Sequence, residues 1–104
     1  MIMKMNRTLS TTDLQNMEVG EFVLRSFYAC KDNPADQPII QEMYRRDKIG
    51  TAYRFGDVET LLQELSHDNI AAAEHLGMLY DLGNERNGIY IDKARAQSYY
   101  DMLG

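Results

Sequence analysis

The two histidines, His67 and His75, are the side chains best suited to bind a metal or move a proton near neutral pH. They lie eight residues apart, whereas a helical zinc site needs two histidines one turn apart on one face. Asp68 and Glu74 are close to them in the sequence, so a chance surface metal site is the alternative. We expect instead that both histidines are hydrogen-bonded or solvated, with no bound metal.

Nucleophilic catalysis has no clear candidate. Cys30 is the single cysteine, and the residues before it, Phe27 to Ala29, are apolar, so we expect a buried thiol that behaves as a small hydrophobic side chain. The sequence has no Gly-x-Ser-x-Gly elbow and no Cys-His pattern, and its glycines do not cluster in a phosphate-binding loop. We therefore predict no catalytic residue, no cofactor and no enzymatic activity.

The net charge of −5 is carried entirely by the second half of the chain. Residues 1–50 hold seven basic and seven acidic side chains, while residues 51–104 hold four basic and nine acidic ones. Direct binding to nucleic acid is disfavoured, because affinity for phosphates comes from clustered Lys and Arg. The one basic cluster, residues 44–48, is expected to be a solvated helix face. The acidic half would attract a basic protein surface, although solubility alone also explains it.

The elements that position these residues are predicted to be helices. Thr12 and Gln15 have the spacing of a capping box. Apolar residues then recur at roughly helical spacing over 19–30, and Gly20 weakens this segment. A strand over 19–30 is the alternative.

A turn separates this segment from the next helix. Residues 31–38 contain both prolines together with Asp and Asn, which favour turns. Pro38 suits the first position of a helix, because proline has a fixed φ and no N–H to leave unpaired. We expect that helix to continue to Phe55 without a stop.

The second half has clearer helix boundaries. Gly56 and Asp57 predict a helix end followed at once by a helix start. The next apolar residues have the spacing of an amphipathic helix and are Val58, Leu61, Leu62 and Leu65. After a turn over 66–69, the expected elements are a helix over 70–82 ending at Gly83, a loop over 84–91, and a last helix capped by Asp92.

The second half also contains an internal repeat, in which residues 49–57 align with residues 76–84 at a constant offset of 27. The matched positions are Gly50 and Gly77, Tyr53 and Tyr80, and Gly56 and Gly83. A glycine inside a helix allows another helix to approach closely, and the closing glycine ends the helix. We expect replacement of either inner glycine by Leu to lower the melting temperature.

This pattern resembles the tetratricopeptide repeat superfamily, in which a helix with Leu-Gly-x-x-Tyr ends in Gly-Asp or Gly-Asn. The second unit is more similar to the Sel-one-like subclass, with alanines at 71–73 and the aromatic pair Tyr99 and Tyr100. The offset of 27 is shorter than the usual ~34 residues, and two units are fewer than the ~3 that a stable array needs. A generic helical bundle is the alternative.

The resemblance implies an all-α fold of antiparallel helical hairpins with an N-terminal helical cap. The whole chain would form a single domain. Its expected parts are a flexible start over 1–10, capping helices over 12–43, a first hairpin over 44–66 and a second hairpin over 69–103.

The resemblance also implies a protein-protein interaction module, such as a small bacterial adaptor, chaperone or regulator, that binds a peptide or helix in a groove. The first helix of each hairpin lines this groove in the family. Carried onto this chain, the lining residues are Tyr44, Asp47, Thr51, Arg54, Phe55, Ala71, Glu74, Met78, Asp81 and Leu82. Their mixture of apolar and charged side chains suits a protein partner with a basic or amphipathic segment.

Two other functions stay open. An acidic inhibitor or immunity-type protein could block a basic enzyme or a nucleic-acid-binding protein, and a homodimer is a third interpretation. No apolar run approaches the ~20 residues needed to cross a bilayer, and the start lacks the apolar segment of a signal peptide. We therefore expect a cytoplasmic protein without membrane contact, with export by a route that reads no cleavable signal left open.

Overall fold

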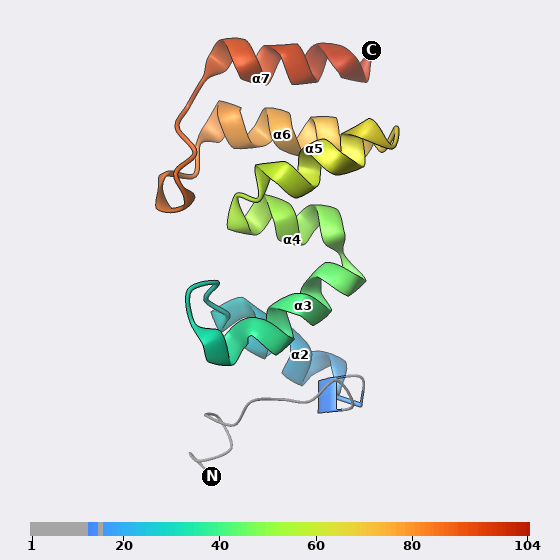
Figure 1. The fold of residues 1–104 in the computed structure, drawn as a ribbon, viewed down its shortest axis with the longest axis vertical. Helices are drawn as coiled ribbons and strands as arrows, with labels where there is room; N and C mark the ends of the chain where they lie inside the picture. The colour runs from blue at the N-terminus through green and yellow to red at the C-terminus, as the bar shows by residue number, and fades with distance from the viewer. Residues whose placement is uncertain (1–12, 15) are drawn as a thin grey trace. The chain divides into compact units, whose positions relative to one another are not determined.

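The computed structural model describes residues 13–14 and 16–104. They divide into two compact units, one ending at Arg46 and one over Asp47–Gly104, each described by itself (Figure 1). The described residues form helices and no strand, which confirms the all-α class. None of these helices is long and apolar enough to cross a membrane. The predicted flexible start and the Thr12–Gln15 capping box lie outside the described residues, and the single-domain organisation stays a prediction.

The first unit contains α2 (Val19–Tyr28), the 3₁₀ turn η2 (Pro34–Asp36) and α3 (Gln37–Arg46). The strand alternative for residues 19–30 is therefore wrong, and Gly20 does not interrupt the helix. The η2 turn begins at Asn33, whose side chain accepts a hydrogen bond from the Ala35 N–H at 3.0 Å. α3 begins directly after this turn, at Gln37, one residue before the predicted start at Pro38.

One face of α2 packs against α3, and its other face is exposed. Phe22 on the inner face is buried, and so is Ala29 just beyond the helix end. The other buried apolar side chains of this unit are Leu14, Ile39, Ile40 and Met43. The outer face carries the exposed residues Val19, Val23, Leu24, Phe27 and Tyr28.

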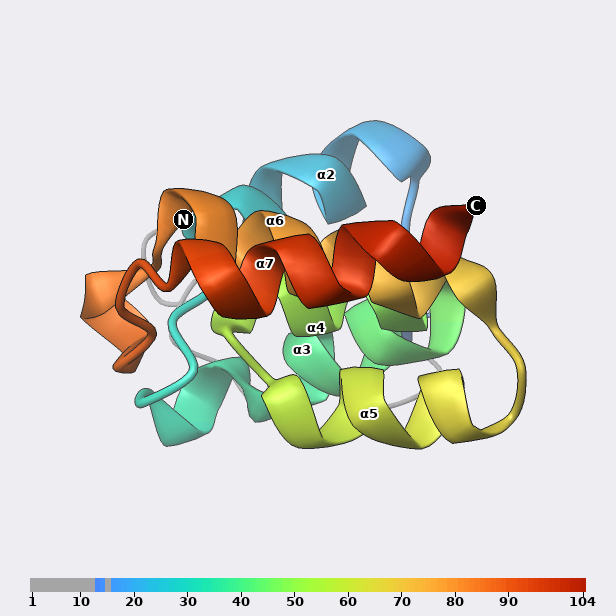
Figure 2. The same cartoon turned by 90° about the horizontal axis from the view of Figure 1, so that it is seen from above.

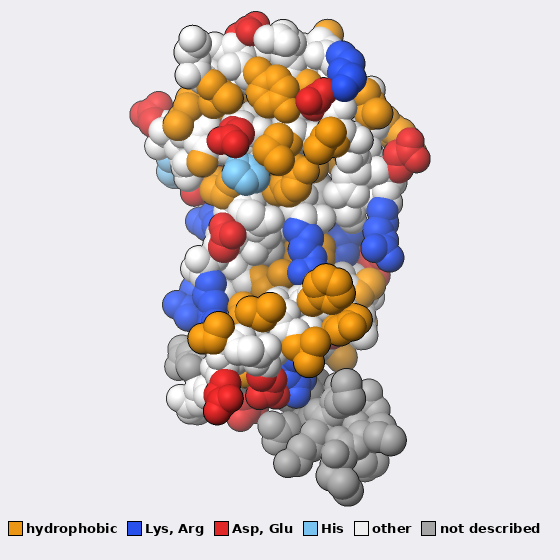
Figure 3. Space-filling model, turned by 180° about the vertical axis from the view of Figure 1, so that it is seen from behind, with side chains coloured by type: hydrophobic (Ala, Val, Ile, Leu, Met, Phe, Trp, Pro, Cys, Tyr) orange, Lys and Arg blue, Asp and Glu red, His pale blue; other side chains and the backbone are white. Residues whose placement is uncertain are grey.

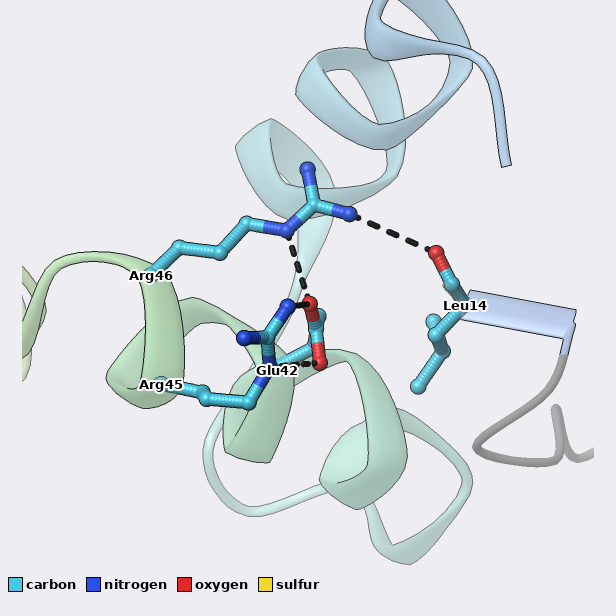
Figure 4. Close-up of polar contacts among 4 residues, drawn as sticks. All are labelled: Leu14, Glu42, Arg45 and Arg46. Carbon is cyan, nitrogen blue, oxygen red and sulfur yellow. Dashed lines mark hydrogen bonds and ion pairs between the residues drawn. The ribbon is translucent and has the colours of Figure 1, made fainter. Parts of the chain in front are cut away.

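A buried carboxylate, Glu42, links the parts of the first unit (Figure 4). Its oxygens accept hydrogen bonds from Arg45 Nε at 2.9 Å, Arg45 Nη2 at 2.5 Å and Arg46 Nε at 2.8 Å. Arg46 also donates from Nη2 to the Leu14 carbonyl at 3.4 Å, and its guanidinium lies 3.8 Å from the centre of the Phe22 ring. Glu42 therefore holds an arginine that contacts both α2 and the turn at Leu14.

The predicted continuous helix from Pro38 to Phe55 is wrong, because the chain leaves the helical path at Asp47. This residue has φ −150° and ψ 83°, and its carboxylate accepts the Gly50 N–H at 3.0 Å to cap α4 (Lys48–Phe55). A side chain that satisfies the backbone N–H groups of a new helix competes with continuation of the old one.

The second unit consists of α4, α5 (Val58–Ser66), α6 (Ile70–Leu82), the turn η3 (Glu85–Asn87), α7 (Lys93–Tyr100) and the turn η4 (Asp101–Leu103). From Gly56 onward its helix boundaries follow the predicted residues, whereas the start of α4 does not. Gly56 has φ +67°, a conformation that favours glycine. The carboxylates of Asp57 and Asp92 cap α5 and α7 by accepting the N–H groups of Thr60 at 3.1 Å and Arg95 at 3.0 Å.

The central helix of the second unit is α6, which contacts α4, α5 and α7. Ala72, Ala73 and Leu76 on α6 are fully buried. α7 lies along α6 with the chain running in the opposite direction (Figures 1 and 2). In the amphipathic set predicted for α5, Leu61 is fully buried, whereas Leu62 is exposed. The core of this unit is therefore centred on α6 and is completed by buried residues of α4, α5 and α7.

Cys30 is exposed, so the predicted buried thiol is wrong. α2 ends at Tyr28, and Ala29 has the extended conformation φ −65°, ψ 134°, so Cys30 does not follow the buried helix face. The Cys30 backbone N–H donates instead to Asp36 Oδ2 at 2.8 Å, at the end of η2.

Replacement of Glu42 by Gln should lower the free energy of unfolding by about 1–2 kcal/mol, because two arginines lose a charged hydrogen-bond acceptor. The matched control is Glu21→Gln, which removes the more exposed Glu21–Arg25 pair at 3.2 Å and should change stability by no more than about 0.5 kcal/mol. Chemical denaturation followed by circular dichroism measures both, and equal effects would contradict the role given to Glu42.

The same carboxylate predicts a pH dependence. Hydrogen bonds from Arg45 and then Arg46 lower the pKa of Glu42 from 4.5 to about 2. Because the pKa is lower in the folded state, this stabilisation is present above pH 4.5 and is lost as the pH falls toward about 2. Between these values the stability of Glu42→Gln should fall less steeply than that of the parent chain, and parallel curves would count against this assignment.

Candidate protein-binding surface

The structure makes several of the predicted groove residues unavailable to a partner. Thr51 and Phe55 on α4 are buried in the second unit. Asp47 is exposed, but its carboxylate caps α4. Arg54 is half-buried, with its guanidinium 5.0 Å from the centre of the Phe55 ring. Tyr44 lies half-buried on α3 in the first unit. Thr51 and Phe55 are therefore excluded from a candidate surface, while α6 carries five predicted residues that are all at least partly exposed.

The predicted lining residues of α6 fall on one face of that helix, which we call the α6 stripe. Its members are Ala71, Glu74, Met78, Asp81 and Leu82. Glu74 and Leu82 are exposed, and the other three are half-buried. Leu76 and Leu79, on the opposite side of the helix, are buried. The back view of the molecule shows acidic and hydrophobic side chains mixed on the face of the second unit (Figure 3).

Tyr100 of α7 forms one edge of the α6 stripe. A Cβ atom placed on Gly77 would lie 2.5 Å from Tyr100 Cε1 and 2.7 Å from Cδ1, so the ring rests directly on the α6 backbone. The role predicted for Gly77, close approach of another helix, therefore applies. Gly50 differs, because the atoms nearest to a Cβ there belong to the Asp47 carboxylate. Gly50 leaves space for the cap of its own helix.

Asp81 is held by α7 and is not a free charge. Its carboxylate accepts hydrogen bonds from Lys93 Nζ at 2.5 Å and from the Tyr100 hydroxyl at 3.2 Å. The hydrogen bond from Lys93 lowers the pKa of Asp81, while burial and then the Asp81 hydrogen bond raise the pKa of Tyr100. Asp81 therefore fixes Tyr100 over Gly77, and Glu74 is the carboxylate of the α6 stripe that is left more open to solvent.

Tyr53 of α4 lies near the other edge of the α6 stripe, against His75. The two ring centres are 5.5 Å apart and the planes are nearly perpendicular, at 77°. His75 Nδ1 donates to the Ala71 carbonyl at 2.8 Å, which is the hydrogen-bonded state expected for this histidine. The α6 stripe therefore lies between aromatic side chains from α4 and α7.

Tyr53 and Tyr100 are not among the residues predicted to line the groove. Both carried a signal, since Tyr53 is a matched residue of the repeat and Tyr100 belongs to an aromatic pair. The repeat partner of Tyr53 lies elsewhere: Tyr80 stacks on Tyr99 with ring centres 6.1 Å apart, and Arg95 donates to the Tyr80 hydroxyl at 3.3 Å. Residues matched in sequence thus have different neighbours.

Among residues 13–14 and 16–104, no group of three or more His, Cys, Asp and Glu side chains is arranged to hold a metal ion. No protein-family model matches the chain, and no curated protein or solved structure shows significant similarity to it. Function is therefore inferred from the side chains of the α6 stripe and its two edges.

Replacement of Gly77 by Ala should lower the free energy of unfolding by about 1–3 kcal/mol, because the added methyl group overlaps the Tyr100 ring. In a Tyr100→Ala background the same change should instead stabilise the protein by up to about 1 kcal/mol, since alanine is the better helix former. A double-mutant cycle from denaturation curves measures the reversal of sign, and additive effects would exclude the contact.

Replacement of Asp81 by Asn should lower the melting temperature, because Lys93 loses its ion pair and Tyr100 loses a charged acceptor. The effect should largely disappear when Lys93→Met and Tyr100→Phe are already present. Differential scanning calorimetry of the single, double and triple variants tests this. A loss that persists in the combined background would show that Asp81 acts through other groups.

Proposed function

We propose that this chain is a protein-protein interaction module that binds a helix or extended segment of another protein along the α6 stripe. The observation that carries the proposal is that α6, packed against three other helices, keeps one open row of mixed acidic and apolar side chains. A helix placed at the centre of a unit normally hides its side chains, so an open row flanked by tyrosines suits recognition.

The side chains of the α6 stripe define the chemistry of the partner. Met78 and Leu82 offer apolar contact, and methionine adapts to partners of different shape. Glu74 is one turn from Met78 and is exposed, so it suits a Lys or Arg beside an apolar anchor. The partner segment is therefore amphipathic, with an apolar side chain over Met78 and Leu82 and a basic residue near Glu74.

A degenerate tetratricopeptide or Sel-one-like origin is part of this proposal. It is supported by the closing glycines Gly56 and Gly83, which both have positive φ (+67° and +76°) at matched positions, while their ψ values of 30° and 162° differ. Gly77 supports it further, because it lies under an aromatic side chain from the following helix. An adaptor, chaperone or regulator is the kind of protein that such a module serves, acting without catalysis in the cytoplasm.

The acidic composition of residues 51–104, nine acidic against four basic side chains, favours one second candidate. It is an inhibitor that covers a basic enzyme or a nucleic-acid-binding protein with its negative surface. Such binding would depend on the summed charge of the unit and not on the apolar side chains of the α6 stripe.

Selection from a random peptide display library against the full chain tests the two candidates. We expect selected peptides to be amphipathic and basic, and to lose at least about tenfold in affinity to Met78→Glu and Leu82→Asp. The control Glu85→Lys removes an exposed acidic residue that lies outside the α6 stripe, and it should have little effect on affinity.

Salt separates the candidates further. Binding by the α6 stripe should survive an increase from about 50 to about 500 mM salt in large part, because apolar contacts are not screened. The opposite result would favour the inhibitor and exclude the module. In that case the affinity would be unchanged by Met78→Glu and Leu82→Asp, would fall with Glu85→Lys, and would be lost at high salt.

A further inference from the structure

α2 presents a continuous apolar face on the outside of the first unit. Val19, Val23, Leu24, Phe27 and Tyr28 are each 58–73% exposed on this ten-residue helix. Hydrophobic side chains gather over α2 in the back view (Figure 3). Exposed apolar patches on small proteins mark interaction sites. We call these five residues, together with Gly20, the α2 face.

Gly20 lies in the first turn of α2 and points along the middle of the α2 face. With about 3.6 residues per turn, Gly20 and Phe27 point away from the buried Phe22, and Val23 and Leu24 lie between them. A Cβ placed on Gly20 would meet no neighbouring atom within 4 Å. Packing within the first unit therefore does not require a glycine here, although glycine weakens a helix. The glycine leaves a notch in an otherwise apolar surface.

We propose that the α2 face binds the α2 face of a second copy of this chain, with the two helices antiparallel about a two-fold axis midway between Val23 and Leu24. In this register Gly20 faces the partner's Phe27, and Val23 lies in the same layer as the partner's Leu24. The notch at Gly20 therefore receives the Phe27 ring of the partner. Val19 and Tyr28 are nine residues apart, so they point to opposite flanks of the helix and lie at the edges of the contact.

The charges around α2 favour the antiparallel arrangement. Glu18 and Glu21 lie at the start of the helix, and Arg25, which also pairs with Glu21 of its own helix, is the basic residue of its last turn. Antiparallel pairing brings the acidic end of each helix beside the basic end of the other and opposes the two helix dipoles. Parallel pairing would place like charges together.

The distribution of charge along the chain also favours self-association through the first unit. Residues 1–50 carry no net charge, whereas residues 51–104 carry all of the net −5. Two copies would repel each other through their second units but not through their first. Self-association through α2 therefore uses the unit that carries no net charge.

The size of the α2 face indicates a reversible dimer. A helix of ten residues is about 15 Å long, so each copy buries less than the ~800 Å² that is typical of a stable interface. We expect monomer and dimer to exchange, with dissociation in about the micromolar range.

Sedimentation equilibrium of the full chain, from about 1 μM to about 1 mM, tests the dimer. Phe27→Asp should weaken it at least about tenfold, whereas Tyr90→Asp, at an exposed aromatic residue of the second unit, should leave it unchanged. Gly20→Gln is the sharper variant. It should keep or raise the melting temperature, because the site has free space and Gln is a better helix former, yet it should also weaken the dimer about tenfold by filling the notch.

Disulfide formation tests the register. In a Cys30→Ser background, Gly20→Cys and Phe27→Cys chains are mixed and oxidised. The antiparallel register predicts that the mixed 20–27 product exceeds either self-product, because these two positions face each other across the two-fold axis. A chain that stays monomeric up to about 1 mM, a dimer that tolerates Gly20→Gln, or an excess of self-products would each overturn the proposal.

Discussion

The second unit depends on α6 being buried by three other helices at once. Such a position requires small side chains where neighbours come closest, and α6 provides Ala72, Ala73 and Gly77 there. The same requirement fixes the rest of the unit. Tyr100 can lie on the backbone only at Gly77, and Asp81 one turn later holds the Tyr100 hydroxyl. The α6 stripe is what remains once the other faces are covered, so the candidate surface is a by-product of the packing.

The first unit has a small apolar core, and a buried polar cluster supplements it. The buried Glu42 carboxylate on α3 accepts a hydrogen bond from Arg46, and the Arg46 guanidinium lies over the Phe22 ring of α2. A buried carboxylate is tolerated only when its hydrogen bonds are complete, and two arginines complete them here. This arrangement stabilises the inner face of α2 and does nothing to cover the outer one. The apolar α2 face is therefore left to an interaction outside the unit.

The helix boundaries of the second unit could be predicted because they depend on single residues with local effects, such as Gly56, Asp57 and Asp92. The break at Asp47 could not, since helical periodicity continues through it and the capping bond to Gly50 is visible only in three dimensions. Burial of Thr51 and Phe55 was missed for a related reason. Their exposure depends on which helices pack against α4. A family pattern identifies equivalent positions in the sequence but does not say which residues surround them in this chain.

The order of helix packing in the second unit has a consequence for how the chain folds. α4 packs on α5, α5 on α6 and α6 on α7, so most partners are adjacent in the sequence. Forming such contacts closes only short loops, and the entropy lost before the first contact is made is small. Helical proteins with contacts of this local kind reach the native state in microseconds to milliseconds. The second unit is therefore suited to fold rapidly.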